Sequence, residues 1–290
     1  MTKNKLLLVD GNSVAFRAFF ALHNSLERFK NRNGLHTNAI YAFNTMFENV
    51  MQKEQPTHVL VAFDAGKTTF RTEMYAEYKG GRSKTPGEFK EQMPYIRDLL
   101  TGLGVQYYEL PNYEADDIIG TLAEKVDKDQ FDVVVLSGDR DLTQLASKEV
   151  KVDITVKGVS DIESYTPEHV AEKYDGLTPK QIIDMKGLAG DASDNIPGVT
   201  KIGEKTAIKL LKQYGSVEGI YEHIDEMKQS KMKENLINDK EQAFLSKKLA
   251  TINTSAPVDV SIDSLKYEGK NLDKLVPFYK EMDFNQFLSC

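Results

Sequence analysis

Three short apolar runs, each followed by an aspartate, most strongly constrain the fold of this chain. They are residues 6–9 with Asp10, residues 59–63 with Asp64, and residues 133–136 with Asp139. Continuous apolar runs of this length are typical of strands that are buried on both faces, as in a parallel sheet. A single strand-end aspartate often forms a turn or caps a helix. Three of them at one sheet edge, where α/β proteins bind ligands, favour a common site.

The remaining pattern completes an α/β fold. Residues 105–110 and 150–156 are predicted to be strands, the latter alternating as a half-buried edge strand does. Helical spacing of apolar residues covers 13–26 and 39–51, and the chain after Pro167 is expected to be helical throughout. We therefore predict a central, mostly parallel sheet flanked by helices in residues 1–178 and a helical region in residues 179–290.

Composition excludes several classes of protein. No apolar run approaches the roughly 20 residues that span a bilayer, and the first run breaks at Asp10, so neither a membrane segment nor a signal peptide is expected. Cys290 is the only cysteine, which excludes an intrachain disulfide and a zinc–cysteine cluster and favours a reducing, cytoplasmic location. The net charge of −7 argues against non-specific nucleic-acid binding unless bound cations neutralise some of the acids.

Further acids surround the third run and recur in the helical region. Glu114 and Asp117 are three residues apart at a predicted helix start, so they share one helix face, with Asp116 about 100° away. Such acids can also simply complement the helix dipole. The full set of candidate acids is Asp10, Asp64, Glu114, Asp116, Asp117, Asp139, Asp141, Asp191 and Asp194.

So many carboxylates cannot ionise in one crevice without cations. Ligation by oxygen alone, without His or Cys, favours Mg²⁺ or Mn²⁺, and the number of acids predicts two or more ions. Two such ions about 4 Å apart promote the in-line displacement of a phosphoryl group, here by water. We expect Arg17, Lys79 and Arg82 to bind the scissile phosphate and stabilise added charge in catalysis.

Two segments are predicted to hold a polyanion. Basic and aromatic residues alternate through 67–84 without a core-forming stripe, as expected of a mobile segment over a site, although a solvated loop with local tyrosine packing remains an alternative. Gly198 and Gly203 enclose a tight turn before a helix, beside Lys201 and Lys205. No strand precedes Gly198, which excludes a Walker A loop. A helix-hairpin-helix motif that binds the nucleic-acid backbone is therefore a better interpretation than a simple turn between two helices.

In combination these motifs resemble those of the structure-specific 5′-nucleases, the flap-endonuclease family that includes the 5′-nuclease domains of bacterial DNA polymerase I. The matching segments are the strand-end Asp10 and Asp64, YEADD at 113–117, SGDRD at 137–141, GDASDNIPG at 190–198 and GVTKIGEKTA at 198–207. The resemblance implies a helical arch at about 65–100 and a helix-hairpin-helix at about 187–215. It further implies 5′–3′ exonuclease and flap-endonuclease cleavage of DNA in primer removal and repair.

The resemblance also implies residue roles. Asp10, Asp64, Glu114 and Asp116 would form a first metal site, and Asp116, Asp139, Asp141 and Asp191 a second, with Asp117 and Asp194 holding waters or contacting the metal ligands. DNA would contact the arch at Arg71, Tyr78, Lys79 and Arg82, with Tyr78 stacking on a base. Duplex DNA would bind at Gly198, Lys201, Gly203 and Lys205, where proteins of this family often also bind a K⁺ ion.

The expected partners are nicked or branched duplex DNA with a 5′ flap and RNA primer–DNA hybrids. They would meet a monomer in the bacterial cytosol, near the nucleoid. Two other classes stay open: a PIN-type RNase, which shares the acidic sheet edge, and a non-catalytic protein that binds branched DNA. Whether the chain is free-standing or a domain excised from a polymerase I is also open.

Overall fold

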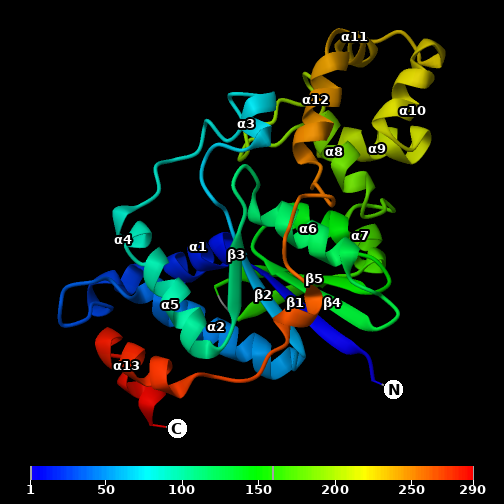
Figure 1. The fold of residues 1–290 in the computed structure, drawn as a ribbon. Coiled ribbons are helices and arrows are strands. Elements are labelled where there is room, and N and C mark those ends of the chain that lie inside the picture. Colours follow the sequence, from blue (N-terminus) through cyan, green and yellow to red (C-terminus); the bar gives the residue numbers. More distant parts are fainter. Residues whose placement is uncertain (1, 159, 290) are drawn as a thin grey trace.

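A six-stranded sheet forms the centre of the molecule (Figure 1). The computed structural model describes residues 2–158 and 160–289, so Cys290 lies outside the described residues. In the order β3-β2-β1-β4-β5-β6, the strands are β1 (Asn4–Asp10), β2 (His58–Phe63), β3 (Gln106–Glu109), β4 (Phe131–Ser137), β5 (Val150–Lys157) and β6 (Asp161–Tyr165). All neighbours pair in parallel except β5 and β6. The predicted mostly parallel α/β sheet is confirmed.

One strand was not predicted from the sequence. β6 follows β5 directly and pairs with it antiparallel, so β6 forms the edge of the sheet. The prediction that residues 150–156 form an edge strand is therefore wrong. The sequence of β6, DIESY, contains only two apolar residues, and too short an alternation to separate a strand from a loop.

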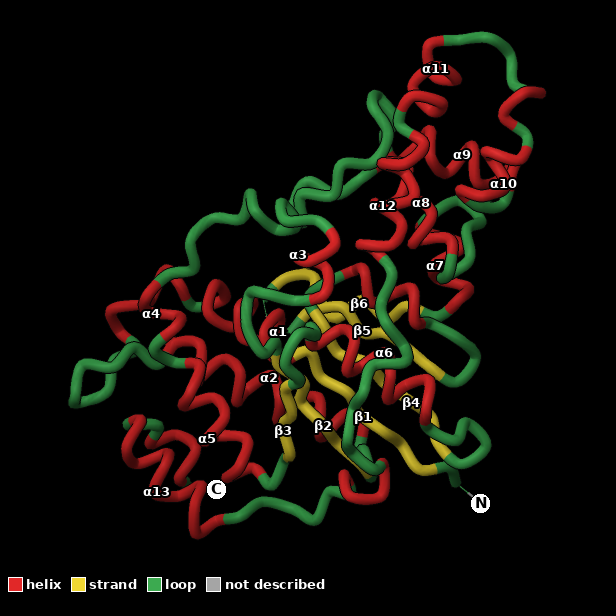
Figure 2. Tube along the Cα trace, turned by 45° about the horizontal axis from the view of Figure 1, so that its top comes forward, coloured by secondary structure: helices red, strands yellow, loops and turns green. Residues whose placement is uncertain are grey.

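Helices cover both faces of the sheet (Figure 2). Alternate side chains of β1 serve opposite layers: Leu7 and Val9 pack in one apolar cluster, and Leu6 and Leu8 pack in the other. The first layer contains α1 (Gly11–Ala21), α2 (Asn38–Glu54), α5 (Met93–Leu103) and α13 (Leu272–Met282). On the other face α6 (Ala115–Lys125) packs on the sheet, and the same apolar cluster continues through α7 (Pro167–Lys173), α8 (Gln181–Ala189), α9 (Glu204–Tyr214), α10 (Val217–Glu222), α11 (Lys231–Asn238) and α12 (Lys240–Ala250), of which α9 to α12 extend away from the sheet (Figure 1).

The remaining elements are short or peripheral. They are the α-helices α3 (Phe70–Met74) and α4 (Gly87–Lys90), with the 3₁₀ turns η1 (His23–Arg28), η2 (Arg140–Leu145), η3 (Ile224–Glu226), η4 (Ile262–Leu265) and η5 (Asn285–Leu288). The single helix expected at 13–26 divides, because α1 ends at Ala21 and η1 follows.

Two predicted regions have different limits in the structure. Of the residues 65–100 predicted to form an arch, those from Met93 onward belong to α5, where Ile96 and Leu99 are fully buried in the core. The chain after α12 returns along the sheet, and α13 packs beside α5, far from the other C-terminal helices (Figure 1). Residues 179–290 therefore do not form one contiguous helical body. Among the described residues, no helix has the length and apolar character needed to cross a bilayer.

Candidate metal and nucleic-acid site

The loops at the carboxyl edge of β1 and β4 hold Asp10 in place. The Asp10 carboxylate caps α1 by accepting the Ser13 N–H at 3.3 Å, and it accepts the Ser137 hydroxyl at 2.9 Å. Gly11 allows this tight turn, because a Cβ there would lie 2.4 Å from the ring of Phe63. The two serines were not predicted as site residues, and their only sequence signal is their position beside strand ends.

Asp64 is held in the same way at the end of β2. Its backbone N–H donates to Asn12 Oδ1 at 2.8 Å, and its carboxylate accepts the N–H of Ala115 at 2.7 Å. Asp64 therefore faces the first turn of α6, which carries Asp116. The sequence prediction that strand-end aspartates and the helix acids share one edge agrees with this geometry.

Burial and mutual repulsion raise the pKa of the acids that gather here. Burial and then the charge of Asp64 raise the pKa of Asp10 to about 6. Burial, Asp10 and Asp139 together raise the pKa of Asp116 well above its usual value. The pKa values of Asp64 and Asp139 are also raised, mainly by burial. Lys79 counteracts the rise at Asp64, Asp116 and Asp139 without cancelling it, so the protein itself compensates the negative charge of this group only in part.

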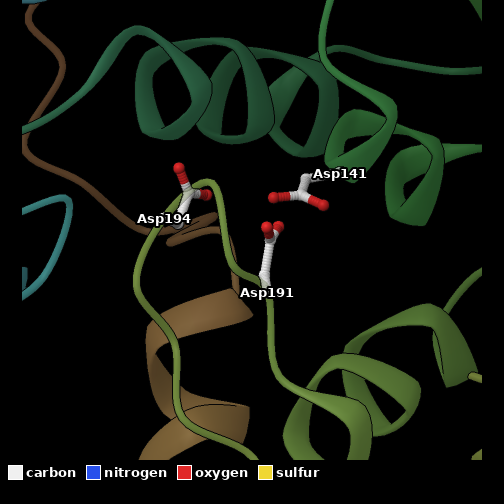
Figure 3. A group of neighbouring side chains, drawn as sticks. All are labelled: Asp141, Asp191 and Asp194. Atoms are coloured by element: carbon white, nitrogen blue, oxygen red, sulfur yellow. The ribbon is translucent and has the colours of Figure 1, made fainter. Parts of the chain in front are cut away.

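A second group of acids joins the loop after α8 to the start of η2. Asp141, Asp191 and Asp194 each offer an oxygen within 4.8 Å of the others, and the three side chains point toward one another (Figure 3). Burial and the charge of Asp139 raise the pKa of Asp141 to about 8. Such a set of converging oxygens fits a hard divalent cation.

Lys186 forms ion pairs with two acids of this second group. Its ammonium lies 3.4 Å from Asp141 Oδ1 and 2.9 Å from Asp191 Oδ2. Burial opposes ionisation of Asp191, but Lys186 outweighs it and lowers the pKa of that carboxyl. The sequence analysis missed Lys186, although it lies on α8 little more than one turn before the GDASD segment.

Glu114 and Asp117 differ from Asp10, Asp64, Asp116 and Asp139 because they form ion pairs with basic side chains of the chain. The two residues form a capping box at the start of α6. The Arg71 guanidinium bonds to Glu114 at 2.5 Å and to Asp117 at 2.8 and 2.9 Å. Burial tends to raise the pKa of Glu114, but Lys79 and Arg71 outweigh it and lower that pKa. Asp117 is fully buried.

Arg71 requires a correction to its predicted role. Only 3 % of its surface is exposed, and its remaining donors bond to the carbonyls of Leu249 at 3.0 Å and Thr251 at 2.7 Å. Every guanidinium nitrogen of Arg71 therefore bonds inside the protein. We no longer propose Arg71 as a contact to DNA, and assign it to hold α3, α6 and the end of α12 together.

The other predicted arch residues lie against the acids. Lys79 bonds to Glu114, and Arg82 bonds to Asp194. The Tyr78 hydroxyl lies 3.3 Å from both Glu114 oxygens, and its side chain is buried, so its ring is not free for stacking in this structure. Arg17 lies beside Gly138 and donates to the Val156 carbonyl at 3.3 Å. The first three side chains thus reach the carboxylates directly, and Arg17 approaches the same edge from α1.

The turn between α8 and α9 is compact. Gly198 has a φ of 65°, and a Cβ there would lie 2.4 Å from the nitrogen of Gly190, so only glycine fits this close approach. Gly203 precedes α9 as its cap, and Lys201 and Lys205 are exposed beside it. These two lysines are separate from the acid groups, and a role in DNA binding remains a prediction for them.

This fold and this acidic edge define a class of nucleases. Residues 5–175 match the family model of the 5′-3′ exonuclease N-terminal, resolvase-like domain, and residues 177–273 match that of the 5′-3′ exonuclease C-terminal SAM fold. The chain belongs to the 5′-3′ exonuclease family, and the predicted resemblance to 5′-nucleases is confirmed. Within that family it is 62 % identical over 286 residues to DNA polymerase I of Streptococcus pneumoniae. That match covers 99 % of this chain but 32 % of the relative, so the chain spans about a third of its length.

Solved structures have the same fold. The D15 protein of phage T5, co-crystallised with metal ions, aligns with a TM-score of 0.74 at 22 % identity over 97 % of this chain and 99 % of that chain. A variant of the T5 D15 flap endonuclease, in a pseudo-enzyme–product complex with DNA and metal ions, also aligns with a TM-score of 0.74 at 22 % identity, over 97 % of this chain and 98 % of that chain. At this identity the likeness establishes the fold.

Proposed function

We propose that this chain is a divalent-metal-dependent 5′-nuclease that hydrolyses DNA phosphodiesters at 5′ ends and 5′ flaps. One observation carries the proposal. Asp10, Asp64, Asp116 and Asp139 gather at one sheet edge with raised pKa values, beside the converging oxygens of a second acid group. A protein that only bound branched DNA would have no use for buried, mutually repelling carboxylates.

The donor set fits hard cations. All nine predicted acids offer oxygen, and no cysteine or histidine lies among them, which favours Mg²⁺ or Mn²⁺. We propose that one ion takes oxygens from the group around Asp116 and another from the group of Asp141 and Asp191. The T5 proteins with this fold are described with metal ions, which supports the proposal. The K⁺ ion proposed at the hairpin rests on the resemblance alone.

The protein's own cations have a part in the reaction. Bound divalent ions would supply positive charge to the attacking and leaving oxygens of an in-line displacement by water. Lys79 and Arg82 already lie against Glu114 and Asp194, so they are placed to transfer to the scissile phosphate once those acids bind cations. Phosphate offers the same charge-assisted hydrogen bonds that these side chains make now. Arg17 would approach the phosphate from the α1 side.

We propose duplex DNA with a 5′ flap as the substrate, together with RNA primer–DNA hybrids. The exposed Lys201 and Lys205 beside the cap of α9 form a surface suited to backbone phosphates. A structural relative is described in complex with DNA, and a close sequence relative is a DNA polymerase I, which supports a role in primer removal and repair. We propose that the chain acts as a monomer.

The test is cleavage of a 5′-labelled flap duplex in Mg²⁺ and in EDTA, with single-stranded RNA and blunt duplex as controls. We expect product near the flap junction in Mg²⁺ and none in EDTA. Tight binding of the flap without product would identify a non-catalytic binder. Cleavage of the RNA control alone would place the protein with the PIN-type RNases.

A further inference from the structure

Two loops far apart in the sequence are joined by hydrogen bonds above the site. The Lys79 N–H donates to the Asp194 carbonyl at 2.7 Å, and the Asn195 side-chain amide donates to the Glu77 carbonyl at 2.8 Å. The Arg82 Nε adds a bond to the Ser193 carbonyl at 3.3 Å. We call this set of contacts between residues 77–82 and 193–195 the clamp. It connects residues 77–82, within the predicted arch, to the loop that carries Asp191 and Asp194.

The backbone of both loops has an unusual conformation within the clamp. Lys79 has a φ of 58° and Asn195 a φ of 56°, so each loop places a non-glycine residue in the left-handed region. Asparagine tolerates this region better than most residues, whereas lysine does not. Backbone strain of this kind persists only where the surroundings hold it, and it is common at functional sites. The clamp therefore holds Lys79 in a position that a free loop would leave.

Each of the two loops joined by the clamp also has a side chain at the acidic site. Lys79 bonds through its side chain to Glu114, and Asp194 belongs to the group with Asp141 and Asp191. The clamp thus sets the distance between a cation of the arch and the loop that bears the second acid group. Asn195 is the one clamp member that acts through a neutral side chain and makes no bond to any of the acids' carboxylates among the described residues.

We propose that Asn195 is a positioning residue of the nuclease. Its amide holds the Glu77 carbonyl, and through it Lys79, against the acid groups, while the exposed residues 83–84 beyond the clamp stay free for the 5′ strand. This role rests on the proposed function. Misplacing a reacting group by about 1 Å can cost on the order of 100-fold in rate, so we expect the loss of Asn195 to reduce cleavage much more than DNA binding.

The main variant is Asn195→Gly, because glycine keeps the left-handed backbone and removes only the amide. Asn195→Asp serves as a second variant, since it keeps the size and backbone preference but lacks the donor. Asn112→Gly is the matched control: Asn112 has a φ of 74°, is exposed, and lies two residues from Glu114. Its side chain makes no hydrogen bond to any described residue, so we expect that variant to cleave like wild type.

Three measurements decide the proposal. Single-turnover cleavage of saturating flap in Mg²⁺ should fall by roughly 10–100-fold in Asn195→Gly and Asn195→Asp. Flap affinity in EDTA should stay within about twofold of wild type, because no phosphate contact is lost. Hydrogen exchange at the Lys79 amide should become faster, because its bond to Asp194 opens more often.

A double variant separates positioning from general loop stability. If Asn195 acts through Lys79, adding Asn195→Gly to Lys79→Ala should reduce the rate no further. A fully additive loss, or wild-type cleavage together with slow exchange at Lys79, would overturn the proposal. If the wild-type protein itself forms no product, the nuclease proposal fails and the catalytic role of Asn195 fails with it. Exchange at Lys79 would then still decide whether Asn195 closes the clamp.

Discussion

Asp116 lies among three acids, Asp10, Asp139 and Glu114, whose charges repel its own. Burial and the charges of Asp10 and Asp139 raise its pKa, and Lys79 offsets this only in part. Glu114, on the same helix start, has the opposite balance, because Arg71 and Lys79 lower its pKa. The protein's own cations therefore compensate the charge of Glu114 but leave much of the repulsion at Asp116 for a bound cation to neutralise. A divalent ion at Asp116 would relieve this repulsion.

Replacing Asp116 by asparagine should abolish cleavage while flap binding stays near wild type. The loss should exceed the roughly 10–100-fold that removing a hydrogen-bond partner of a metal ligand costs. Without metal the same variant should melt at a higher temperature than wild type at pH 8, because one repelling charge is gone. Asp132→Asn is the control, since Asp132 is largely exposed on β4. Full activity in Asp116→Asn would exclude Asp116 from the metal site.

The acids could be predicted from the sequence, but the direction of the basic side chains could not. Strand-end aspartates share an edge by topology alone, so Asp10, Asp64 and Asp139 follow from three apolar runs. Arg71 lies on a five-residue helix, too short for a periodic stripe to show which face is buried. Its burial depends on Glu114 and Asp117, which come from another element.

At the scale of elements, α9 explains how a basic surface is presented. Its buried residues Ala207, Leu210 and Leu211 recur at three- and four-residue intervals, so one stripe packs on the core. The helix starts after Gly203, whose position leaves the first N–H groups of the helix near Lys201 and Lys205. The spacing of glycines and lysines allowed this hairpin to be predicted from the sequence.

Lys201→Ala and Lys205→Ala should each weaken duplex binding and reduce the slope of log affinity against log salt by roughly 0.9, as expected for one lost phosphate contact. Cleavage at saturating substrate should remain near wild type, because neither lysine lies among the acids. The matched control is Lys228→Ala, which removes another exposed lysine of the same region. An unchanged salt slope in both hairpin variants would remove the hairpin from the duplex-binding surface.

Other elements could not be predicted, because long-range packing determines them. The sequence of β6 has too few apolar residues for a strand prediction, and the neighbouring β5 supplies its pairing. α13 has a clear apolar face, yet nothing in that face shows that it packs against α5. In both cases the local pattern identifies an apolar surface but not its partner.

At the scale of the whole molecule, the acid groups couple stability to pH and to metal. Raised pKa values mean that the folded protein binds protons more tightly than the unfolded chain, where aspartate titrates near about 3.9. The resulting stability is fully present below that value. It is lost as pH rises through the folded-state values of about 6 for Asp10 and about 8 for Asp141. The metal-free protein should therefore become less stable between about pH 4 and 8.

Adding Mg²⁺ should reverse this loss, since cations bind the deprotonated acids and replace the protons. We expect the rise in Tm on adding Mg²⁺ to be clearly larger at pH 8 than at pH 5.5, measured by thermal unfolding at constant ionic strength. Asp116→Asn should show a smaller rise than wild type at pH 8. Equal rises at both pH values would mean that these acids do not titrate with metal.

Direct observation of the ions tests the central claim, that the acid groups form a divalent-metal site. The measurement is the anomalous scattering of Mn²⁺ in crystals of the protein grown with the metal. We predict anomalous peaks bound by oxygens of Asp116 and its neighbours and by oxygens of Asp141 and Asp191, with Lys186 moved away from the latter. Crystals with Mn²⁺ in solution but no peak at either acid group would contradict the account.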